Sequence, residues 1–137
     1  MTTMPTTFSE WVFFLLQQYG VLFVKGAMVT LLLALVGTFI GCLIGFIVGI
    51  IQTIPVDPNM GAVKKNFYRV VRWLLDAYVE VFRGTPMIVQ AMVVYYGSMS
   101  LFNIDMSAMF AGFLVVSINT GAYMAEIVRG GIEAVDK

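Results

Sequence analysis

The fold class follows from one uncharged stretch, residues 26–55, which reads GAMVTLLLALVGTFIGCLIGFIVGIIQTIP. A helix over residues 27–54 would be about 42 Å long, which exceeds the roughly 30 Å hydrocarbon core of a bilayer. A cleaved signal peptide is disfavoured, because its apolar region would have only about 7–15 residues behind a basic start, and residues 1–20 contain neither Lys nor Arg. The sequence therefore predicts an all-α membrane protein whose first span covers about residues 26–54.

Composition supports this class and excludes several functions. Of the 137 residues, 60% are apolar and 12% are charged, against roughly 45–50% and 25% in soluble domains. Eight basic and eight acidic residues cancel, so the chain lacks the basic surplus that binds nucleic acid. With no His and only Cys42 as a thiol, it offers no His-centred triad, no Cys/His zinc site and no internal disulfide. We expect no metal and no cofactor.

Two further apolar stretches predict a second span at about residues 73–99 and a third at about 106–128. The second contains Gly84, Thr85 and Pro86, and we expect its helix to kink or start afresh there, because proline lacks a backbone donor and crowds the preceding turn.

Basic residues gather between the first two spans, at Lys64, Lys65, Arg69 and Arg72, whereas residues 1–24 and 100–105 contain none. The positive-inside rule then places the N-terminus outside.

The N-terminal segment and the first span carry two further signals. Residues 1–20 contain Trp11 and Tyr19, which suit headgroup depth, and we expect either an external or interfacial segment or a simple extension of the first helix. Glycines recur at every fourth position of the first span, and this spacing predicts close helix packing: Gly37, Gly41, Gly45 and Gly49. Packing within the chain is favoured over a subunit interface or a sliding surface.

The second and third apolar stretches each carry three residues at the spacing i, i+4, i+7, which places them on one helix face: Arg83, Met87 and Gln90, then Asn119, Tyr123 and Glu126. Ionisable groups inside a span are costly unless they face protein or water. We expect the two amides and the tyrosine to line a polar pocket near the membrane middle, with the arginine and the glutamate at its inner end. A transported zwitterion would use both charges.

A second interpretation of the same residues stays open. Arg83 and Glu126 would form a structural ion pair or extend to the inner membrane surface, and Gln90 and Asn119 would only bridge helices.

Two motifs also support a family resemblance. The segment EVFRGTPMIVQ at residues 80–90, followed by NTGAYMAEIVRGG at 119–131, resembles the membrane subunits of bacterial polar amino-acid ABC importers of the histidine/arginine/glutamine permease type. The resemblance covers about residues 19–137 and implies that residues 21–137 belong to a five-span type I importer transmembrane domain. Members of the family continue into the Glu-Ala-Ala coupling loop and two more spans, so we expect this chain to be truncated before that loop.

The resemblance also implies residue roles. It makes Arg83, Gly84, Thr85 and Pro86 the signature of the second helix. It places Asn119, Tyr123 and Glu126 beside the pathway. It makes four later residues the approach to the ATPase coupling loop: Gly130, Gly131, Glu133 and Asp136.

The function implied is a permease subunit of an ATP-driven, binding-protein-dependent importer of polar amino acids in the bacterial cytoplasmic (inner) membrane. The implied partners are an ATP-binding subunit, a second permease subunit, identical or different, and an extracytoplasmic amino-acid-binding protein. The chain itself is not expected to be an enzyme, since it has no phosphate-cradling G-x-x-x-x-G-K-S/T pattern. The alternatives are a small homo-oligomeric channel and an inactive, truncated permease remnant.

Overall fold

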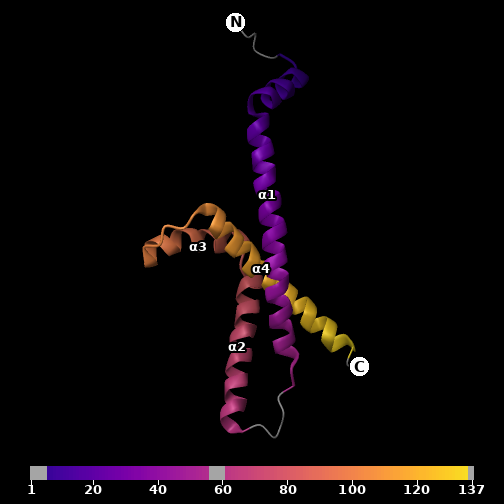
Figure 1. Cartoon of the computed structure of the whole chain (residues 1–137), viewed down its shortest axis with the longest axis vertical. Helices are drawn as coiled ribbons and strands as arrows, with labels where there is room; N and C mark the ends of the chain where they lie inside the picture. Colours follow the sequence, from indigo (N-terminus) through magenta and orange to yellow (C-terminus); the bar gives the residue numbers. More distant parts are fainter. Residues whose placement is uncertain (1–5, 56–60, 136–137) are drawn as a thin grey trace. The chain divides into compact units, whose positions relative to one another are not determined.

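The computed structural model describes residues 6–55 and 61–135, and in these ranges the chain forms four helices and no strand (Figure 1). They are α1 (Phe8–Thr53), α2 (Ala62–Gly84), α3 (Met87–Phe102) and α4 (Ala108–Val135). The all-α prediction is confirmed. The chain divides into two compact units, Met1–Leu32 and Leu33–Lys137, which are described separately below.

The first unit contains the beginning of α1. The helix starts at Phe8 and continues through residue 20 without a break; residues 1–5 of the predicted external segment lie outside the described residues. Nearly all its side chains are exposed, including Phe8, Phe13 and Val21. Because exposed aromatic and aliphatic surface is unfavourable in water, this composition fits a lipid environment.

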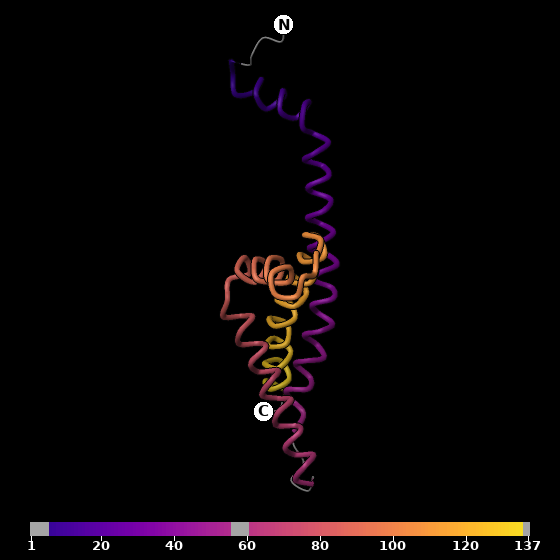
Figure 2. Tube along the Cα trace, turned by 90° about the vertical axis from the view of Figure 1, so that its left-hand side faces the viewer, coloured from indigo at the N-terminus to yellow at the C-terminus, as the bar shows by residue number. Residues whose placement is uncertain are grey.

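The second unit is held together by close packing of α1 on α4. The four regularly spaced glycines of α1 are buried and face α4, which lies beside this part of α1 in Figure 2. A Cβ added at Gly41 would lie 2.8 Å from the carbonyl oxygen of Ser117, and one added at Gly45 would lie 2.5 Å from that of Gly121. The backbones therefore approach too closely for any side chain at these glycines.

The break predicted near Gly84 is present. Helix α2 ends at Gly84, Thr85 is extended (φ −111°, ψ 140°), and α3 begins after Pro86; Figure 1 shows the chain changing direction here. The expectation that Arg83, Met87 and Gln90 share one helix face is therefore wrong, because Arg83 belongs to α2 and the other two to α3. The cause is Pro86, which removes a helix donor and keeps the preceding residue out of the helical region.

Two of the described helices, α1 and α4, are long and apolar enough to cross a membrane by length and composition. Helix α3 is apolar but has only 16 residues, fewer than the roughly 20 that usually span. The predicted span over residues 73–99 thus consists of two helices, and its crossing of the bilayer stays a prediction.

A small core lies between α1, α2 and α4. Val48, Val79 and Ala125 are buried together. Beside them Tyr78 donates its hydroxyl hydrogen to the carbonyl oxygen of Ile118 over 2.6 Å. This core fixes the position of the polar residues described next.

Candidate functional site

Two amide side chains join the break between α2 and α3 to α4. Gln90 is 7% exposed, and its Nε2 donates to the carbonyl oxygens of Phe82 (2.9 Å) and Thr85 (3.0 Å) and to the Thr85 hydroxyl (2.8 Å). Asn119 Nδ2 donates to the same Phe82 oxygen and to Gln90 Oε1, both over 3.1 Å. These amides satisfy carbonyl groups that the end of a helix leaves without partners.

The structure therefore brings Gln90 and Asn119 together in an arrangement that bridges three helices. Neither residue is among those that line the cavity described next. Their contact with a substrate stays a proposal.

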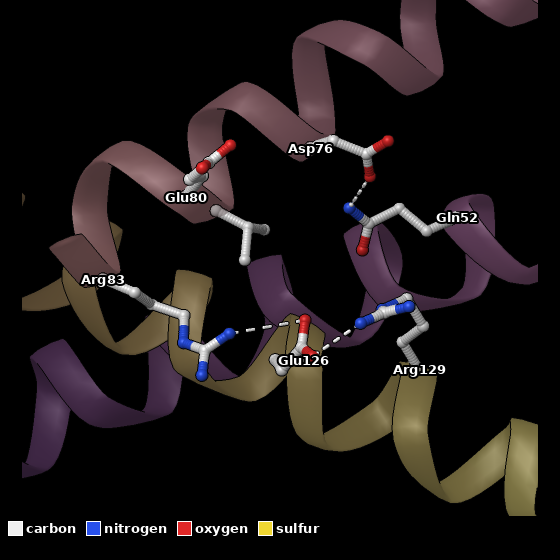
Figure 3. A pocket seen from close by; sticks show the side chains of 7 residues that line it. Gln52, Asp76, Glu80, Arg83, Glu126 and Arg129 are labelled. Carbon is white, nitrogen blue, oxygen red and sulfur yellow. Dashed lines mark hydrogen bonds and ion pairs between the residues drawn. The ribbon is translucent and has the colours of Figure 1, made fainter.

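A cavity of about 360 Å³ is lined by residues of α1, α2 and α4 (Figure 3). Two uncharged residues, Gln52 and Val79, line it together with five residues that carry charges of both signs: Asp76, Glu80, Arg83, Glu126 and Arg129. Glu126 forms ion pairs with two arginines, at 3.5 Å from Arg83 Nη1 and 2.6 Å from Arg129 Nη2. The side chains of Arg83 and Glu126 are 41% and 33% exposed, so their pair contributes little to stability.

The opposite wall carries hydrogen-bond acceptors. Gln52 is 5% exposed, and its Nε2 donates to Asp76 Oδ1 over 2.7 Å. Its other amide atom, Oε1, is buried and has no partner among the described residues. Arg72 donates to the backbone oxygen of Gln52 and so holds the end of α1 against α2. A buried acceptor without a donor costs about 1–3 kcal/mol, so Gln52 Oε1 is an unsatisfied group at the cavity wall.

The other residues expected at the site lie around these two features. The Tyr123 ring lies 5.7 Å from Arg83 Cζ, within the range of a cation–π contact. Met87 is half-exposed on α3 and is absent from the cavity lining. Gly130 and Gly131 have no neighbour within 4 Å of an added Cβ, whereas Glu133 pairs with Arg129 at 3.4 Å. Asp136 lies outside the described residues.

Sequence reasoning missed Gln52, Asp76, Glu80 and Arg129 as site residues. Asp76 and Glu80 precede Arg83 at the spacing i, i+4, i+7, the same signal that identified the other polar faces. They also follow the basic residues of α2 closely in the sequence, where charges at the inner membrane surface are expected. Gln52 is the polar amide near the end of the uncharged stretch, and a search for buried polar groups near span ends would have found it.

The cavity presents charged and amide side chains. In the described ranges, no group of three or more His, Cys, Asp or Glu residues could hold a metal. The charges of both signs that line the cavity, with the amide of Gln52, suit a small ligand that carries both a cationic and an anionic group.

Comparison with known proteins adds independent findings. A family model described as "Binding-protein-dependent transport system inner membrane component" matches residues 59–137, more than half of the chain. The arginine transport system permease protein ArtQ of Bacillus subtilis is 40% identical over 74 residues, and the match covers 54% of this chain and 34% of that protein. A putative glutamine transport system permease protein GlnP of Rickettsia bellii is 42% identical with the same coverage.

A solved structure gives a longer match. The crystal structure of an amino acid ABC transporter with histidines matches 96% of this chain and 53% of that chain, with a TM-score of 0.74 and 32% identity. The chain spans about a third of the length of the curated relatives it matches.

Proposed function

The chain belongs to the family of binding-protein-dependent transport system inner membrane components, and from this premise we propose that it is a permease subunit of an ATP-driven importer of polar amino acids. The observation that carries the proposal is the cavity whose walls hold both carboxylates and guanidinium groups. Every polar amino acid carries an ammonium and a carboxylate group, and these match charges of both signs. The named relatives, which include arginine and glutamine permease proteins, support the same substrate class.

The proposed mechanism is binding without covalent chemistry. The cavity holds the substrate differently in an outward-facing and an inward-facing conformation, and ATP use by another subunit shifts the balance between them. In this proposal Arg83 and Glu126 contact the charged groups of the substrate. The remaining pathway residues lie around the break and on the adjoining face of α4: Met87, Gln90, Asn119 and Tyr123.

We propose three spans, at about residues 26–54, 73–99 and 106–128, with the N-terminus outside and the protein in the bacterial inner membrane. The basic residues between the first and second spans support this orientation. Helix α1 has 46 residues, about twice the number that a span requires, so we place residues 1–20 in the outer interface or beyond it.

The proposed partners are an ATP-binding subunit, a second permease subunit and an extracytoplasmic amino-acid-binding protein. We place the approach to the ATPase at the end of α4, around Gly130, Gly131, Glu133 and Asp136. Exposed Gly130 and Gly131 leave this part of the helix open to another protein. The relatives, all named as permeases, favour neither the independent channel nor the inactive remnant.

Two measurements test the proposal. The chain is purified from its native membrane in mild detergent, and the copurifying proteins are identified by mass spectrometry; we expect an ATPase subunit. The complex is then reconstituted in vesicles with ATP, and uptake of radiolabelled polar amino acids is measured with and without the external binding protein. Ion conductance by the chain alone, without an ATPase and without uptake, would contradict the proposal.

A further inference from the structure

We propose that the first turns of α2 form a binding site for an anionic phospholipid of the inner monolayer, made by Lys65, Arg69 and Arg72 with Trp73 beside them. The proposal rests on the orientation proposed above, in which these residues lie at the inner membrane surface, and adds a ligand that is not transported. The site is a second hollow, which shares only Asp76 with the cavity beside Glu126.

The first argument is the positive charge of this hollow. It has a volume of about 350 Å³, and the residues that line it are Lys65, Arg69, Arg72, Trp73 and Asp76. The four charged residues follow the spacing i, i+4, i+7, i+11, which places them along one face of α2. Three cations and one carboxylate leave two net positive charges, which attract an anion.

Contacts with α1 decide where along this row an anion binds. Asp76 Oδ1 accepts from Gln52 Nε2 over 2.7 Å, and Arg72 donates to the backbone oxygen of Gln52. A guanidinium group has five N–H donors, so Arg72 keeps donors for a further acceptor. Lys65 and Arg69 are exposed at the other end of the row. An anion therefore binds toward Lys65 and Arg69 and away from the carboxylate.

The second argument is the apolar surface of the same turns. Four exposed apolar residues repeat the spacing of the charged row: Val63, Phe67, Val70 and Leu74. Each precedes a charged residue of the hollow by two positions and so lies on nearly the opposite side of the helix. Trp73 is 66% exposed and follows Arg69 by four positions, which places the two side by side. A cationic face opposite an apolar face is typical of a helix at a membrane interface, and tryptophan suits headgroup depth.

These observations specify a phosphate group that is carried by a lipid. Guanidinium groups bind phosphate oxygens through two parallel hydrogen bonds, and lysine adds a point charge. Clusters of at least about four Lys or Arg residues next to the cytoplasmic end of a span are typical of anionic-lipid sites. The exposed apolar row suits acyl chains better than it suits a protein surface in water. A zwitterionic phospholipid carries a cation that offsets its phosphate, so the net positive hollow favours an anionic one.

The test measures which lipid lies beside Trp73. The chain has two tryptophans, so Trp11→Phe leaves Trp73 as the fluorescent reporter. The purified full chain is placed in vesicles of equal parts phosphatidylglycerol and phosphatidylcholine, in which one or the other lipid is brominated and quenches a neighbouring indole. We expect phosphatidylglycerol to associate beside Trp73 about 5-fold or more strongly than phosphatidylcholine.

Substitutions in this background locate the site. Lys65→Gln and Arg69→Gln each remove a charge from the hollow, and we expect each to lower the preference for phosphatidylglycerol below about 2-fold. Lys64→Gln is the matched control, because it removes the same charge one position away and Lys64 is not among the described residues that line the hollow. Its preference should stay within about 1.5-fold of the parent value. Lys65 and Arg69 are exposed, so their replacement breaks no buried contact, and circular dichroism checks that the helices form.

The outcomes separate this site from general surface charge and from transport. Equal preferences in Lys64→Gln and Arg69→Gln would overturn the site, because diffuse charge acts alike on both, and so would a parent without preference for phosphatidylglycerol. An unchanged lipid preference in Arg69→Gln, together with loss of a copurifying ATPase, would assign the cluster to a protein contact instead. Uptake of amino acids is measured separately on the complex. Uptake without lipid preference would reject the lipid site alone, whereas lipid preference without uptake would reject the transport function alone.

Discussion

The substitution Gly45→Ala is expected to weaken the packing of α1 on α4. Its added methyl group would lie 2.5 Å from the carbonyl oxygen of Gly121, 2.5 Å from Met124 Cβ and 2.8 Å from the backbone nitrogen of Ala125. Ordinary contacts begin near 3.4 Å, so the overlap approaches 1 Å. Two of the three atoms belong to the backbone of α4 and yield only if the helices separate.

The magnitude follows from two opposing effects. Overpacking of a close contact costs about 1–3 kcal/mol, while alanine gains up to about 1 kcal/mol over glycine in helix propensity. We expect a net loss of about 1–2 kcal/mol in the free energy of unfolding. Gly26→Ala is the matched control on the same helix, because an added Cβ there meets nothing within 4 Å, and it should be neutral or slightly stabilising.

The assay is unfolding of the purified chain in mixed micelles, titrated with a denaturing detergent and followed by circular dichroism. Equal free energies for Gly45→Ala and Gly26→Ala would refute the reasoning, because they would show that α1 and α4 do not approach at the glycines. A loss confined to Gly45→Ala supports the described contact.

Two more predictions concern the polar residues. Gln90→Leu removes the donor to the Thr85 oxygen and one of the two donors to the Phe82 oxygen, which keeps Asn119. We expect the same titration to show a loss of about 1–3 kcal/mol from the acceptor left unpaired; a loss below about 0.5 kcal/mol, the size of an ordinary surface substitution, would mean that the bridge does not form. A double-mutant cycle on Arg83→Ala and Glu126→Ala should give a coupling free energy below about 1 kcal/mol, because both side chains are partly exposed and 3.5 Å apart. A coupling several times larger would indicate a dry, buried pair.

Much of the fold was predictable because local signals decide it. Three features can be recognised from residues close together in the sequence: the uncharged stretch of residues 26–55, the Gly-Thr-Pro break and the four-residue glycine spacing. Proline breaks a helix wherever it stands inside one, and small residues on one helix face allow another helix to pack closely. The ion pair of Arg83 with Glu126 was one of the alternatives that the sequence left open, since two charges in apolar stretches favour partners.

The composition of the cavity was not predictable in the same way. It joins Gln52, near the end of α1, to Asp76 on α2 across 24 positions of sequence. Periodicity assigns residues to a face of one helix but does not say which faces of two helices meet. The break at Pro86 also moved Gln90 off the face of Arg83 and placed it on a separate helix, where its amide reaches back to the end of α2.

Helix α4 connects every feature of the second unit. Gly121 and Ala125 lie against the glycines of α1, Asn119 binds the break between α2 and α3, and Glu126 holds the arginines of the cavity. These residues lie within about two turns of one helix, so α4 cannot shift along its axis without disturbing all three contacts. Because the glycines of α1 pack directly on the backbone and the first side-chain atoms of α4, this seam resists such a shift most strongly. We therefore expect conformational change at the cavity to come from α2 and α3 moving against an α1–α4 pair. The contacts that must then break or follow are the amide bridge of Gln90 and the hydrogen bonds that join α2 to Ile118 and Gln52.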